Sequence, residues 1–103
     1  MPTLVEQVRQ RAHVYVRHGG KTHRRQQVER IITVAAWIGT RERLTGLDQI
    51  GKRQVIDFWK HHRHLSPQTA YGYWLALREL WCWLQRTGEP PRPRTASEVI
   101  NTA

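Results

Sequence analysis

The sequence predicts an all-α fold, a compact bundle of four helices. Apolar residues recur at helical spacing along most of the 103 residues, and no segment shows the alternation that is typical of a strand. Glycine, proline and polar residues separate these periodic segments, which predicts short connections between neighbouring helices. A chain of this length forms one domain with a single core.

The first helix is expected over residues 3–16, because Thr3 and Glu6 have the spacing of a capping box. Its apolar face consists of Leu4, Val8, Ala12 and Tyr15. The second helix is expected over residues 22–38, with Gly39 as its terminator. Its apolar stripe consists of Val28, Ile31, Ile32, Ala35 and Ile38.

The third helix is expected over residues 51–63, after a connector whose apolar residues also enter the core. These connector residues are Leu44, Leu47 and Ile50. The inward face of the third helix is expected to hold Val55, Ile56, Phe58 and Trp59. Tryptophans at such spacing, together with Trp74 and Trp81, favour core packing over base stacking.

The fourth helix has the clearest boundaries. The Ser66 hydroxyl can accept a hydrogen bond from a free N–H of the first turn, and Pro67 suits the first helical position. Gly88, followed by two prolines, is expected to end the helix. The inward face would comprise Ala70, Tyr73, Trp74, Leu77, Trp81 and Leu84, and the opposite face Gln68, Gly72, Leu75 and Glu79.

The composition indicates a polyanionic partner. Lysine and arginine number 17 against 8 acidic residues, which gives a net charge of +9 and a pI near 11.1. Residues 1–46 hold nine of the cations and three of the acids, or +6 of the total. Nucleic acid is the leading candidate, an anionic membrane surface the second, and a ribosomal or tail-like basic chain the third.

Other features exclude several classes of function. A single cysteine, Cys82, rules out an internal disulfide and fits a cytoplasmic protein, and no stretch approaches a membrane span or a signal peptide. His61, His62 and His64 lack the further ligands of a metal site. No phosphate-binding loop and no nucleophile–base pair is evident, so neither a cofactor nor catalysis is expected.

The fourth-helix string resembles a signature of tyrosine recombinases, the integrases of phages and integrons. Their core-binding domain ends in a helix with the pattern Ser-x-x-Thr-x-x-x-Tyr-Leu-x-x-Leu-Arg-x-Phe-x-x-Trp-Leu. Ser66, Thr69, Tyr73, Leu77 and Arg78 match it, while Trp74 and Leu80 stand where the family has Leu and an aromatic residue. Weaker similarity extends over residues 3–100.

This resemblance implies a SAM-like core-binding domain over residues 1–88. Residues 89–103 would then be a linker and the start of a catalytic domain, and the family's catalytic Arg, His-x-x-Arg and Tyr are not in this chain. In the family the second and fourth helices approach the major groove, and the two domains close around the duplex. The chain itself is therefore expected to bind double-stranded DNA and not to be an enzyme. Its expected partners are DNA, the catalytic domain of the same parent chain and other recombinase protomers.

The expected DNA contacts lie at the beginnings of the second and fourth helices. A helix N-terminus offers free N–H groups and partial positive charge to phosphate, and a glutamine side chain can read an adenine edge. The same residues could instead form a solvated basic turn and a helix cap. The candidates are Lys21, Thr22, His23, Arg24, Arg25, Gln26, Arg30, Ser66, Gln68, Thr69, Tyr71 and Arg78. A stand-alone DNA-binding regulator and a protein-interaction module remain alternatives.

Overall fold

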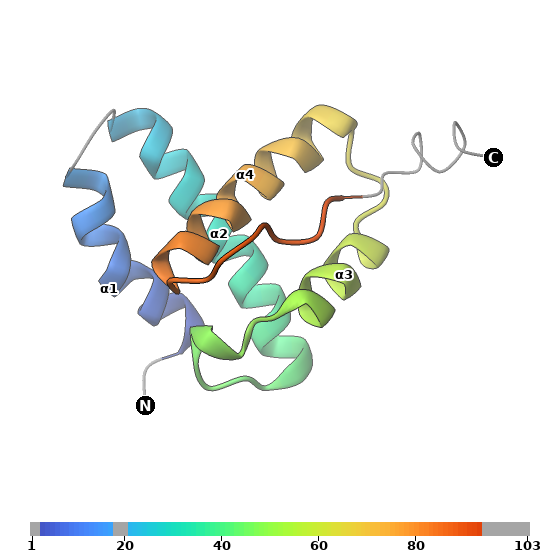
Figure 1. Cartoon of the computed structure of the whole chain (residues 1–103), viewed down its shortest axis with the longest axis horizontal. Coiled ribbons are helices and arrows are strands. Elements are labelled where there is room, and N and C mark those ends of the chain that lie inside the picture. The colour runs from blue at the N-terminus through green and yellow to red at the C-terminus, as the bar shows by residue number, and fades with distance from the viewer. Residues whose placement is uncertain (1–2, 18–20, 94–103) are drawn as a thin grey trace.

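The computed structural model describes residues 3–17 and 21–93, and these form a helical bundle (Figure 1). Its α-helices are α1 (Leu4–Arg17), α2 (Lys21–Glu42), α3 (Lys52–His61) and α4 (Pro67–Trp83). A short 3₁₀ helix, η1 (Leu47–Gln49), connects α2 to α3. The described residues contain no strand, so the expectation of an all-α bundle with four helices is confirmed at this level. No helix among them is both long enough and apolar enough to cross a bilayer.

Helix α2 is the scaffold on which the other helices pack, since α1, α3 and α4 all contact it. The core contains most of the expected apolar residues of each helix, and the connector supplies Leu47 and Ile50, both fully buried. Trp59, Trp74 and Trp81 are each at most 4% exposed. The prediction that these three tryptophans are core residues is therefore confirmed.

The start of α4 matches the sequence-based prediction. Ser66 is the N-cap, its Oγ accepts from the backbone N–H of Thr69 at 3.2 Å, and Pro67 is the first helical residue. The start of α1 is capped in the same way, because the backbone N–H of Glu6 donates to Thr3 Oγ1 at 3.1 Å. Both caps satisfy N–H groups that have no partner inside the helix.

Two helix ends were predicted wrongly. Gly39 does not end α2, which continues to Glu42 and stops where Arg43 adopts a φ of 54°. Gly39 instead lets α1 approach closely, because a Cβ there would lie 3.0 Å from Leu4 Cδ1. Gly88 does not end α4 either, since Gln85 adopts a φ of 56° just after the helix and Gly88 forms a later turn with a φ of 80°.

Two faces were also predicted wrongly. Ile56 is 44% exposed on the outer side of α3, because Val55, Phe58 and Trp59 already fill the inner side. Gly72, expected on an open face of α4, is buried. Helix α4 is enclosed on more than one side because α2 crosses it on the side that carries Gly72.

Residues 85–93, which we call the C-terminal arm, turn back across the bundle after α4 (Figure 1). The indole N–H of Trp74 donates to the carbonyl of Pro90 at 3.1 Å, and that of Trp59 donates to the carbonyl of Pro91 at 2.9 Å. Pro90 is buried. The first part of the expected linker is thus packed against the bundle, whereas residues 94–103 lie outside the described part of the chain.

Candidate nucleic-acid interface

The N-terminal turn of α2 exposes polar and cationic side chains. The helix begins at Lys21, whose side chain is outside the described part of the structure, and no acidic residue occupies its first turn. Thr22, His23, Arg25 and Gln26 are exposed. No described carboxylate lies within 4.0 Å of the Arg25 guanidinium. This end of α2 therefore retains its positive potential.

Arg24 points in a different direction from its neighbours. Its guanidinium donates to the carbonyl of Tyr15 at 2.8 Å and lies 4.5 Å from the centre of the Tyr15 ring. It therefore joins the end of α1 to the start of α2, and sequence reasoning missed this role. Burial raises the pKa of the Tyr15 hydroxyl and Glu79 adds to that effect, while the nearby Arg24 opposes it.

Arg30 occupies the space between α2 and α4. A Cβ built on Gly72 would lie 2.9 Å from both Cζ and Nη1 of Arg30, so the guanidinium rests directly on the backbone of α4. Arg30 is half-buried, and it makes no ion pair or side-chain hydrogen bond with the described residues. The space beside Gly72 is taken by this side chain.

In the first turn of α4, some polar side chains cap the helix and others are exposed to solvent. Ser66 Oγ donates to Thr69 Oγ1 at 2.9 Å while it accepts from the Thr69 backbone N–H. These two hydroxyls complete the helix cap. Gln68 is exposed and forms no hydrogen bond within the described part of the chain, which leaves its amide available to a ligand.

Tyr71 and Arg78 lie on a different flank of α4. Tyr71 is 51% exposed and its ring lies 5.7 Å from that of Trp74. The guanidinium of Arg78 lies 5.2 Å from the Trp74 ring and that of Arg92, from the C-terminal arm, lies 4.5 Å from it. Arg92 was not expected here, and a cation in a proline-rich segment gives no sequence signal for such stacking.

The beginnings of α2 and α4 lie along the same edge of the molecule, and the two helices converge from there toward their crossing (Figure 1). Arg30 follows the start of α2 by nine residues, a rise of roughly 13 Å, and Gly72 follows the start of α4 by five, roughly 8 Å. The structure thus brings Arg30 to Gly72, one turn from Gln68 and Thr69. Thr22, His23 and Arg25 lie farther out on α2.

The histidines near the end of α3 do not form a metal site. His62 stacks on Phe58 with ring centres 4.0 Å apart, and His61 Nδ1 lies 3.4 Å from Asp57 Oδ1, while the other oxygen of that carboxylate pairs with Arg41. Among the described residues, no group of three or more His, Cys, Asp or Glu side chains could hold a metal ion. His62 has a packing role that its sequence position did not reveal.

Comparisons of this chain with protein-family models, with curated proteins and with solved structures find no match.

Proposed function

We propose that this chain binds double-stranded DNA across the edge formed by the beginnings of α2 and α4. The observation that carries the proposal is the Arg30 guanidinium, which rests on Gly72 between the two helices without a carboxylate partner. A guanidinium with free N–H groups is well suited to bind a phosphate through two parallel hydrogen bonds. The net charge of +9 favours the same class of ligand.

In this proposal the contacts have separate tasks. Arg30 binds one phosphate, and the exposed Arg25 with the free N–H groups of the α2 N-terminus binds another. Gln68 is the group that reads a base edge, since its amide can pair with adenine in the major groove. Arg24 supports the interface indirectly because it fixes α2 against α1. Ser66 and Thr69 contribute by capping α4.

We further propose that the chain is the core-binding module of an integrase-like tyrosine recombinase. The support for this is the resemblance of residues 66–84 to the family signature, together with a helical bundle in which α2 and α4 cross and both begin along one edge. In this role the chain positions DNA, and a catalytic domain of the parent protein cleaves and rejoins the strands. The isolated module would then bind weakly and with little sequence preference.

A salt titration with duplex DNA tests the proposal. The logarithm of the association constant should fall linearly with the logarithm of salt concentration, with a slope of about −0.9 per phosphate contacted. Arg30→Ala should weaken binding by about tenfold or more and reduce the slope by about 1, because one phosphate contact is lost. Arg30→Lys should recover only part of the affinity, since it restores the charge without the planar fork.

Lys52→Ala is the matched control, because Lys52 is an exposed cation at the start of α3, away from the proposed edge (Figure 1). It removes the same charge and should change affinity by much less than Arg30→Ala. Equal effects of the two variants would mean that DNA senses only the total charge, and a flat salt response would exclude phosphate binding altogether.

A further inference from the structure

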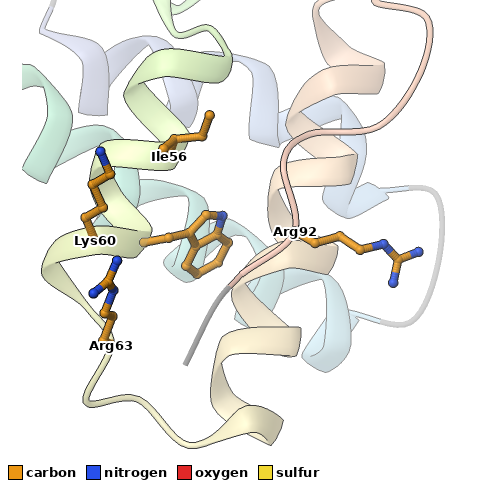
Figure 2. A pocket seen from close by; sticks show the side chains of 5 residues that line it. Ile56, Lys60, Arg63 and Arg92 are labelled. Atoms are coloured by element: carbon orange, nitrogen blue, oxygen red, sulfur yellow. The ribbon is translucent and has the colours of Figure 1, made fainter. Parts of the chain in front are cut away.

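A second surface lies along α3, reaches the core at Trp59 and does not include the Arg30–Gly72 contact. A pocket of about 320 Å³ lies between α3 and the C-terminal arm, lined by Ile56, Trp59, Lys60, Arg63 and Arg92. In Figure 2, Ile56 and Lys60 extend from α3 and Arg63 from the segment just after it, whereas the Arg92 side chain points away from α3. The lining thus combines an apolar floor with two cations on one rim.

The apolar floor is the unusual part of this pocket. Ile56 is 44% exposed, one of three large hydrophobic residues so exposed in the described part of the chain. Trp59 beneath it is only 4% exposed, and its indole N–H is already bonded to the carbonyl of Pro91. The floor therefore offers apolar contact and no free indole donor, which suits an aliphatic side chain better than a phosphate.

The rim of the pocket is cationic and has no acid of its own. Lys60 and Arg63 make no ion pair with the described residues. The neighbouring acids are already paired. Asp57 of α3 pairs with Arg41 at 2.7 Å, Glu42 of α2 pairs with Arg53 at 3.0 Å, and Glu89 of the C-terminal arm pairs with the lining residue Arg92 at 3.6 Å. Charge complementarity thus selects an acidic occupant. A second copy of this chain, with its own net charge of +9, is a poor fit.

We propose that this pocket docks an acidic segment of another protein, with one bulky aliphatic side chain against Ile56 and Trp59 and carboxylates facing Lys60 and Arg63. Ile56 and Lys60 are spaced at i and i+4, so they share one face of α3, and Arg63 follows in the turn just after the helix. One apolar contact flanked by two cations gives modest affinity, so recruitment rather than permanent assembly is the expected role.

The test uses a fluorescent peptide of about ten residues that carries glutamates on both sides of a single leucine, with binding followed by anisotropy. The peptide should bind saturably below about 1 mM, and replacing its leucine by serine should weaken binding. Ile56→Ser should lower affinity about three- to tenfold, as expected for removing a half-exposed isoleucine from the contact. Lys60→Ala should also weaken the complex and reduce its salt dependence.

Val14→Ser is the matched control, because Val14 is a 60% exposed aliphatic residue on α1. It should leave peptide binding unchanged, and circular dichroism melts should show that all variants fold. In ¹⁵N spectra of the intact chain, the indole N–H signal of Trp59 should shift on binding.

Three results would overturn the proposal. The first is an absence of saturable peptide binding, and the second is an equal effect of Ile56→Ser and Val14→Ser. The third is that Lys60→Ala weakens binding of duplex DNA and leaves peptide binding unchanged, which would make this face a DNA contact.

Discussion

Replacing Gly72 by alanine should change stability and DNA binding in opposite directions. Alanine in a helix interior is favoured over glycine by about 1 kcal/mol. The new Cβ would lie 2.9 Å from Arg30 Cζ, 2.9 Å from Nη1 and 3.1 Å from Nη2, and no atom outside the guanidinium is among the nearest. Since these atoms are the end of a flexible side chain, Arg30 can move aside at little cost.

The expected gain in the free energy of unfolding is therefore close to the full difference in helix propensity between alanine and glycine. About 1 kcal/mol corresponds to a rise in melting temperature of about 4–8 °C for a chain of this size. DNA affinity should fall about three- to tenfold, because the guanidinium must move by roughly 1 Å from the place where it bridges α2 and α4. Thermal melts followed by circular dichroism and duplex titration at one fixed salt concentration measure the two effects on the same protein.

Gly39→Ala is the matched control for this prediction. Its Cβ would lie 3.0 Å from Cδ1 and 3.4 Å from Cγ of Leu4, a core side chain that is 4% exposed. Leu4 cannot move into solvent, so overpacking of about 1–3 kcal/mol should cancel or exceed the helix propensity gain. DNA affinity should stay unchanged. If Gly72→Ala were as destabilising as Gly39→Ala, or bound DNA like the original chain, the placement of Arg30 at the interface would be wrong.

Three further predictions separate supporting contacts from binding contacts. Arg24→Ala should destabilise the fold by about 1–2 kcal/mol in urea unfolding because it removes the hydrogen bond to Tyr15, whereas Arg25→Ala should change stability by less than about 0.5 kcal/mol and instead weaken DNA binding. Trp74→Phe should cost about 1–3 kcal/mol, with an unchanged m-value, because the buried carbonyl of Pro90 loses its donor. Burial raises the pKa of Tyr15 in the folded state, so the unfolding free energy should decline as pH rises above 10.0, the usual pKa of tyrosine. Tyrosinate absorbance should show that Tyr15 loses its proton at a higher pH than an ordinary tyrosine. A Tyr15 that titrates like an ordinary tyrosine would contradict this prediction.

Local signals predicted the parts of the fold that depend on neighbouring residues. The cap at Ser66, the first-turn position of Pro67 and the hydrogen bond between Thr3 and the Glu6 backbone all follow from residues within one turn of each other. The apolar stripes were equally local, and they predicted most of the core. The distance between two packed helices depends on residues that are far apart in the sequence. The wrong predictions at Gly39 and Gly72 both concern such close contacts between helices.

The candidate site was predictable only in outline. The sequence identified the two helix beginnings, but it placed Arg24 and Arg30 together as candidate phosphate contacts. The structure gives Arg24 a carbonyl partner in α1 and leaves Arg30 unpaired on α4. A helical wheel places Arg24 close to the apolar stripe of α2 and Arg30 away from it, but it cannot tell which neighbouring helix each one meets.

Of the two glycines inside the described helices, Gly39 is a packing feature and Gly72 belongs to the proposed binding surface, yet the two look identical in sequence. Each costs about 1 kcal/mol of helix propensity, so each needs a compensating contact. At Gly39 the compensation is the core side chain of Leu4, which contributes to stability alone. At Gly72 the neighbour is a half-buried cation with no acid beside it, which adds little to stability and is costly to desolvate further. In the proposed interface, a phosphate bound at that position would supply the missing partner, which would account for Gly72 and Arg30 together.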